Sequence, residues 1–285
     1  MKADIIWLGS TDSTNEEARR RLSDIDNLSV LSALEQTAGR GQRGNKWSSA
    51  HGENLTFSIV LKFPDPEQHG ILAPMKACDQ FILTEIASLS VIDFLSSYGI
   101  GARIKWPNDI YVGNRKICGM LIENSLRGRQ ISSSIIGIGL NINQRNFDVN
   151  LPNPTSLAIE TGKRDLDPAK CLNNLMAIFT GYIEDYLTAS CNGSDMSIRE
   201  KYLSYLWMLD EPAEFIDYTC LPCGHLEGPM NPASEDSLYN GRKFSGMIRG
   251  ISHSGMLIVE DKEKGELKEF AFKEIGFIFL PEKYH

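Results

Sequence analysis

The stretch GRGQRGNKW, residues 39–47, combines three glycines with three cationic side chains. Gly39, Gly41 and Gly44 have the G-x-G-x-x-G spacing of a dinucleotide-binding loop, which must be followed directly by a helix. The next apolar stretch, NLTFSIVLKF (54–63), alternates with the period of a strand instead. The dinucleotide interpretation is therefore disfavoured, because the loop joins two strands. Arginine and lysine on a loop that exposes its backbone still favour a phosphate ligand.

Three other stretches place polar side chains where strands are expected to end or turn. STDSTN (10–15) carries hydroxyls and an amide before an expected helix, although such residues often serve only as caps. KWPNDI (105–110) contains a turn, where Asn and Asp commonly make local hydrogen bonds. The same stretch continues as GNRKICGMLIEN (113–124), in which Lys116 follows a hairpin turn, a place where a lysine is most often a solvated edge charge. In GIGLNIN (137–143), alternate glycines leave room for a group to lie against the backbone.

Hydrophobic periodicity and turn signals predict the elements that position these stretches. Ser13 and Glu16 have the spacing of a capping box at the start of the first helix, and Asp167 before Pro168 predicts the start of another. Strands are expected at 4–9, 28–36, 54–63, 102–106, 109–112, 116–126 and 130–143, with tight turns at Gly113-Asn114 and Arg127-Gly128. Helices are expected at 14–22, at 75–99 and from 168 to about 187, with further helical character around 190–208.

This order of elements predicts an α+β first domain, residues 1–208, with a mostly antiparallel mixed sheet and helices on one side. Residues 209–285 predict a small all-β barrel or sandwich, because AEFIDY, KFSGMIRGIS, GMLIVED and KEFAFKEIGFIF are short strands at regular spacing. Between the first two of these strands lies a long Pro- and Gly-rich loop. Its Cys220, Cys223 and His225 fall short of the four ligands of a structural zinc site, so metal binding there stays open.

The composition excludes several classes of protein. The chain has 285 residues, 42% of them hydrophobic, and a net charge of −8. No apolar run reaches the roughly 18 to 20 residues of a membrane span, and no secretory signal is apparent. The six cysteines lack framework spacing, as in a reducing compartment. We therefore expect a cytoplasmic protein, and the acidic balance argues against nucleic acid as its main partner.

Together the four polar stretches resemble the catalytic domain of biotin protein ligases, enzymes that adenylate biotin and attach it to a carrier lysine. GRGQRGNKW is similar to the family's GRGRRGRxW loop, and KWPNDIYV with RKICGMLIE is similar to its KWPND motif and lysine-containing strand. STN and GIGLNIN follow the family's order. The resemblance covers about the first 190 residues and implies a class II synthetase-like catalytic domain. Many members carry arginine where this chain has Gln42 and Asn45.

The resemblance also implies roles for individual residues. Lys116, Arg40 and Arg43 would neutralise the biotin carboxylate and the α-phosphate of ATP, and the Gly41 and Gln42 amides would close over the adenylate. Asp109 would chiefly position the carrier amine, since a carboxyl group of pKa about 4 is a poor base for an amine of pKa about 10.4. The implied biotin site is Ser13, Thr14, Asn15, Gln36, Arg40, Gly41, Gln42, Lys116, Gly119 and Leu121. The implied ATP site is Arg40, Arg43, Trp47, Lys105, Asn108, Lys116 and Asn141.

The implied substrates are biotin and ATP with Mg²⁺ held mainly by the phosphates, so no metal-ligating side chain is assigned. The implied partner is a biotin carboxyl carrier protein domain, and a homodimer is left open. Because the first catalytic strand begins near Asp4, we expect a monofunctional ligase that binds no specific DNA. A lipoate or octanoate ligase or transferase is the alternative enzyme, although its glycine-rich RRxSGGG-type loop is not seen. A non-catalytic biotin sensor is a third hypothesis, and it predicts damage to Lys116 or to the glycine loop.

Overall fold

The computed structural model describes residues 1–65, 72–192, 196–219 and 241–278. The chain divides into two compact units, Met1–Tyr202 and Leu203–His285. The sequence-based boundary between residues 208 and 209 stays a prediction. Among the described residues, no helix is both long enough and apolar enough to cross a membrane.

One sheet of eight strands forms the frame of the first unit, with the order β1-β2-β3-β8-β7-β6-β5 and β4 beside β8. β1 and β2 pair in parallel, and the other described pairings of this sheet are antiparallel, which confirms the mostly antiparallel prediction. The strands are β1 (Asp4–Thr11), β2 (Ser29–Gln36), β3 (Leu55–Lys62), β4 (Met75–Lys76), β5 (Arg103–Lys105), β6 (Asp109–Val112), β7 (Arg115–Arg127) and β8 (Gln130–Leu140).

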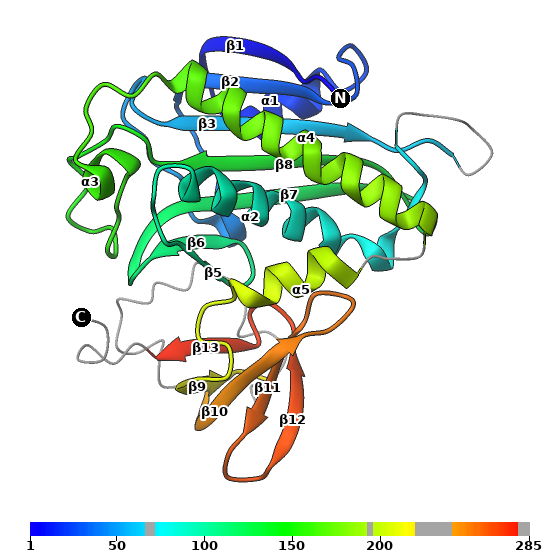
Figure 1. Cartoon of the computed structure of the whole chain (residues 1–285), viewed down its shortest axis with the longest axis vertical. Helices are drawn as coiled ribbons and strands as arrows, with labels where there is room; N and C mark the ends of the chain where they lie inside the picture. The colour runs from blue at the N-terminus through cyan, green and yellow to red at the C-terminus, as the bar shows by residue number, and fades with distance from the viewer. Residues whose placement is uncertain (66–71, 193–195, 220–240, 279–285) are drawn as a thin grey trace. The chain divides into compact units, whose positions relative to one another are not determined.

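Helices cover both faces of this sheet, so the expectation of helices on one side is wrong. Ala18 of α1 (Thr14–Arg20) packs in a buried cluster with Val60 of β3 and Ile135 of β8. On the opposite face, α2 (Phe81–Ser96) packs against α4 (Pro168–Asn192), and both lie in front of the sheet in Figure 1 while α1 lies behind it. The reason is that β3 and β8 are buried along nearly their whole length, which requires cover on both faces.

Two local predictions are also wrong. The helix predicted over 75–99 begins at Phe81, because Met75 and Lys76 pair with β8 and the chain then forms the 3-10 turn η2 (Ala77–Asp79). Arg127 pairs with Gln130, so the turn is Gly128-Arg129, with Gly128 at φ +61°. The predicted helix start at Asp167-Pro168 is confirmed, since Asp167 accepts hydrogen bonds from the first-turn amides of Ala169 and Lys170. Two short helices, α3 (Leu157–Thr161) and α5 (Met196–Ser204), complete the unit's helices within the described range.

The second unit is an antiparallel sheet of five strands with the order β12-β11-β10-β9-β13. Phe215, Phe244 and Phe270 are buried; the Phe244 ring contacts Phe215 at a centroid distance of 5.6 Å and stacks on Phe270 at 6.0 Å. The stretch expected as one last strand is divided by a turn at Lys273, whose φ is +91°. The strands are β9 (Pro212–Asp217), β10 (Arg242–Ile251), β11 (Leu257–Asp261), β12 (Glu266–Phe270) and β13 (Ile275–Ile278). Cys220, Cys223 and His225 lie outside the described residues.

Candidate functional site

The N-terminus of α1 forms one wall of the candidate site, which lies on the face of the sheet that α1 covers. Ser13, Thr14 and Asn15 are all buried. Gln36, at the end of β2, accepts hydrogen bonds from the Thr14 amide at 2.8 Å and from its hydroxyl at 3.2 Å. The hydroxyl of Ser58 on β3 lies 2.6 Å from Asn15 Oδ1 and 2.8 Å from Thr14 Oγ1. The structure therefore brings together the four residues expected to contact the ureido ring.

Asn15 lies directly over a glycine of the sheet. A Cβ added to Gly137 would meet Asn15 Oδ1 at 2.3 Å, so only glycine leaves room for this amide. Asn15 Nδ2 donates to the backbone carbonyl of Leu121 at 3.1 Å and to the Glu123 carboxylate at 2.8 Å. These contacts fix the amide in one orientation over β7 and β8.

Lys116 reaches the site because β7 contains a bulge. The pairing of β6 with β7 shifts between Ile110 and Tyr111, and such an extra residue redirects the side chains beyond it to the other face. A Cβ on Gly119 would meet Lys116 Nζ at 3.2 Å, which places the amine beside Gly119. Lys116 Nζ pairs with Asp109 Oδ1 at 2.7 Å. The two residues expected to do the chemistry are thus in direct contact.

The remaining polar residues of the KWPND stretch and Asn141 are engaged with the protein itself. Asn108 Nδ2 donates to the Met120 carbonyl, and Asn141 Nδ2 donates to the Thr155 carbonyl at 2.9 Å. Both side chains therefore hold neighbouring backbone in place. Burial lowers the pKa of Lys105 to about 8, although Asp109 opposes that shift. The contacts of Asn108, Asn141 and Lys105 with ATP stay predictions.

Trp47, at the end of the glycine loop, lies against the backbone of β7 and β8. A Cβ on Gly139 would meet the Trp47 ring at 2.2 Å, and one on Gly119 would meet it at 3.2 Å. These two glycines pair with each other across the strands and together form a flat floor that admits an aromatic ring. Trp47 Nε1 is buried and has no hydrogen-bond partner among the described residues.

The glycine loop folds back on itself as a narrow hairpin. Arg40 and Lys46 form an isolated antiparallel bridge, and the Gly41 amide donates to the Asn45 carbonyl at 2.7 Å. The turn itself therefore uses the Gly41 amide here, and the closure of the Gly41 and Gln42 amides over the adenylate stays a prediction. The 3-10 turn η1 (Gln42–Gly44) occupies the tip, and Gln42 Oε1 is buried without a described partner. The side chain of Arg43 lies outside the described residues.

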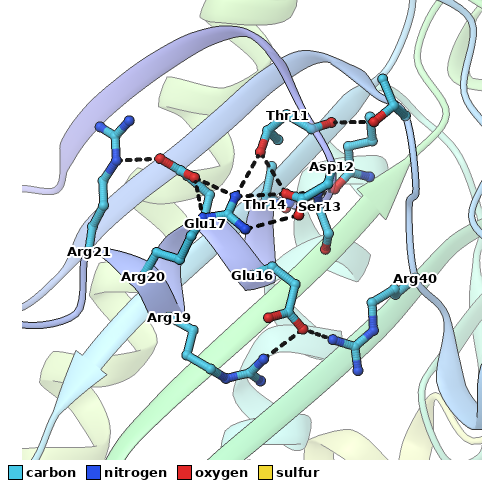
Figure 2. A network of polar contacts seen from close by, with 12 residues as sticks. Thr11, Asp12, Ser13, Thr14, Glu16, Glu17, Arg19, Arg20, Arg21 and Arg40 are labelled. Atoms are coloured by element: carbon cyan, nitrogen blue, oxygen red, sulfur yellow. Dashed lines mark hydrogen bonds and ion pairs between the residues drawn. The ribbon is translucent and has the colours of Figure 1, made fainter.

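Arg40 binds carboxylates on two other elements, as Figure 2 shows for Glu16. Its Nη1 pairs with Glu16 of α1, and its Nη2 lies 3.4 Å from Glu123 Oε1 of β7. Arg19 contacts the same two carboxylates, at 2.7 Å and 3.0 Å. Two cations and two anions thus form one cluster at the edge of the site.

The predicted capping box at α1 does not form. Ser13 is the N-cap residue with extended backbone, but its side chain makes no capping hydrogen bond. Glu16, the other member of the pair, instead binds Arg19 and Arg40. Ion pairing with two guanidinium groups has replaced the bond that the carboxylate would make to the N-cap amide.

Sequence reasoning missed Glu16 as a partner of Arg40, and it missed Ser58 and Glu123 entirely. Ser58 had a usable signal, since it is a lone small polar residue within the apolar run TFSIVL. Glu123 lies on the same strand as Gly119 and Leu121, and the period of two puts all three on one face of it. Its side chain could have been placed on the site face by counting two residues at a time.

The described residues hold no group of three or more His, Cys, Asp or Glu side chains that could bind a metal ion. The arrangement of Lys116, Asp109, Arg40 and the glycine floor suits an anionic ligand with a flat portion.

Comparison with known proteins identifies relatives of this arrangement. Residues 7–141 match the Biotin/lipoate A/B protein ligase family. The biotin--[acetyl-CoA-carboxylase] ligase of Paracoccus denitrificans is 34% identical over 179 residues, which cover 60% of this chain and 70% of that protein. The bifunctional ligase/repressor BirA of Bacillus spizizenii is 32% identical over 187 residues, 64% of this chain and 53% of that protein. The chain thus spans about half the length of the BirA proteins that it matches from two Bacillus species.

A solved structure shows the same fold over nearly the whole chain. The biotin protein ligase from Aquifex aeolicus, in complex with biotin and ATP, superimposes with a TM-score of 0.68 and 27% identity. The match covers 96% of this chain and 97% of that one. The expected fold class is thereby confirmed.

Proposed function

Because the chain belongs to the biotin protein ligases of the Biotin/lipoate A/B protein ligase family, we propose that it joins biotin to a lysine of a biotin carboxyl carrier protein, using ATP. The observation that carries the proposal is the position of Lys116. A one-residue bulge puts its amine beside Asp109 and Gly119. Arg40 contacts Glu123, which lies on the same strand as Gly119.

In the first step, a carboxylate oxygen of biotin attacks the α-phosphorus of ATP and pyrophosphate leaves. Two anions must approach each other, and negative charge gathers between them in the transition state. The Lys116 ammonium neutralises that charge, and Arg40 supplies planar donors for the phosphate. When bound with ATP, Mg²⁺ would offset the charge of the leaving pyrophosphate.

The wall formed by Thr14, Asn15 and Gln36 binds the ureido ring, which offers a small edge of donors and acceptors. The sheet backbone at Gly119 and Leu121 lies under the apolar part of biotin. The Trp47 ring covers the glycine floor at Gly119 and Gly139, which supports a role for its other face in contacting the adenine ring.

In the second step, the neutral amine of the carrier lysine attacks the acyl carbon of biotinoyl-adenylate, the acyl–phosphate bond breaks and AMP leaves, and the proton released from the nitrogen passes to water. Asp109 forms an ion pair with Lys116 at 2.7 Å, which supports a role for it in the same step. We assign to it the positioning of the incoming amine and the stabilisation of its developing positive charge.

The test is to mix the protein with ATP, Mg²⁺, biotin and a purified biotin carboxyl carrier domain, and to follow the mass of the carrier. We expect a mass increase of one biotinoyl group that requires ATP. A parallel reaction with lipoate replaces the acid and keeps all else constant. Modification by lipoate alone would contradict the proposal in favour of a lipoate ligase, and no adenylate with either acid would favour a sensor without catalysis.

A further inference from the structure

The contacts of Arg40 raise a question about how this arginine becomes available to a phosphate. The edge of its guanidinium formed by Nη1 and Nη2 faces Glu16 and Glu123. A bidentate phosphate contact also uses two donors on one edge of the same group. A phosphate and the two carboxylates are therefore alternative partners for Arg40 at this edge.

Glu16 is better suited to this competition than Glu123. Glu123 accepts a hydrogen bond from Asn15 at 2.8 Å, so it has a structural task on the floor of the site. Glu16 does not take part in the cap of α1, and its carboxylate forms ion pairs with Arg19 and Arg40. Beyond the helix surface, Glu16 holds Arg40 of the glycine loop.

We propose that Glu16 is a positioning residue that competes with the ligand phosphate for Arg40 and thereby weakens the hold of the site on nucleotides. The inference rests on the proposed function, because it takes the ligand to be an adenosine nucleotide or an acyl-adenylate. Occupancy of Arg40 by Glu16 lowers the affinity for any phosphate that must displace it, and it speeds release of that phosphate.

The chain offers a matched control on the same helix turn. Glu17 is also a partly exposed carboxylate, but its ion pairs are with Arg20 at 2.5 Å and Arg21 at 2.5 Å, whereas Arg40 pairs with Glu16. Glu16→Gln and Glu17→Gln remove the same charge one residue apart. A general electrostatic effect on anion binding would appear in both variants, whereas competition for Arg40 would appear only in the first.

The experiment measures equilibrium binding of AMP and of adenosine, at one pH and one salt concentration, to the wild type and to both variants. We expect Glu16→Gln to bind AMP about two- to fivefold more tightly, the range typical of a partly exposed ion pair. Adenosine, which lacks the phosphate, should bind equally to all three proteins. In the reaction, Glu16→Gln should lower the KM for ATP with little change in kcat for adenylate formation.

A double-mutant cycle with Arg40→Ala identifies the cation responsible. In the Arg40→Ala background, Glu16→Gln should no longer change AMP affinity. An effect that persists there would assign the gain to Arg19 and overturn the proposal, as would equal effects of Glu16→Gln and Glu17→Gln or weaker AMP binding by Glu16→Gln. A wild type that forms no biotinoyl-adenylate would contradict the proposed function itself, whereas normal synthesis with unchanged AMP affinity in Glu16→Gln would contradict only this role of Glu16.

Discussion

Replacement of Gly137 by alanine tests the packing of Asn15 over the sheet. The added Cβ would lie 2.3 Å from Asn15 Oδ1 and 2.9 Å from its Cγ, so the amide must leave its position. Asn15 is short, and its contacts run to Ser58, Leu121 and Glu123. The whole side chain therefore has to rotate away rather than give slightly.

The expected loss follows from the bonds that the rotation breaks. Two neutral hydrogen bonds at about 0.5 to 1.5 kcal/mol each and one to a carboxylate at about 1.5 to 3 kcal/mol give an upper bound of about 6 kcal/mol. Partial replacement of these bonds by water makes a loss of about 2 to 4 kcal/mol in the free energy of unfolding more realistic. Biotin affinity should fall as well, because the proposed ureido partner is displaced.

Urea denaturation of wild type and Gly137→Ala measures the stability change, and equilibrium binding of biotin measures the effect on the site. Gly9→Ala in β1 is a matched control, because a Cβ at Gly9 has no atom within 4 Å. A Gly137→Ala variant with wild-type midpoint and wild-type biotin affinity would refute the placement of Asn15.

Two further predictions concern Lys105 and Gln42. Burial lowers the pKa of Lys105 to about 8 from the ordinary value of 10.5, so the folded state disfavours the charged amine and stability should rise with pH between about 8 and 10.5. Lys105→Met should remove that rise in thermal unfolding measured across this range. An unchanged slope would contradict the burial of the amine. Gln42→Arg should slow the release of biotinoyl-adenylate by several-fold, because a hydrogen bond from a charged donor is stronger than one from a neutral donor by about 1 kcal/mol. Equal dissociation rates of the purified intermediate at one salt concentration would mean that the side chain at position 42 points away from the phosphate.

Periodicity predicted most strands of the first unit, because apolar residues alternate with a period of two in stretches such as NLTFSIVLKF. It could not predict the start of α2, where Met75 and Lys76 have helix-compatible neighbours but pair with β8. Pairing of that kind depends on a strand more than fifty residues away, and it overrides local propensity.

In the site too, local sequence motifs were predictive and contacts between distant residues were not. The motifs located Lys116 and Asp109 in the sequence, and the bulge that brings them within 2.7 Å appears only in the pairing of β6 with β7. The partners of Arg40 were not predictable, because Glu16 has the spacing of a capping box and that local rule suggested another use for its carboxylate. Long-range ion pairs leave no periodic signal in a sequence.

The central claim is that Lys116 neutralises charge during adenylation of biotin, and its most direct test is the rate of biotinoyl-adenylate formation by Lys116→Ala. The control is Arg115→Ala, which removes the neighbouring cation on β7, one that pairs with Glu160 at 2.9 Å. The account predicts that Lys116→Ala folds normally and forms adenylate about 10² to 10³ times more slowly than the wild type, while Arg115→Ala keeps the wild-type rate. Adenylate formation at the wild-type rate by Lys116→Ala would contradict the account.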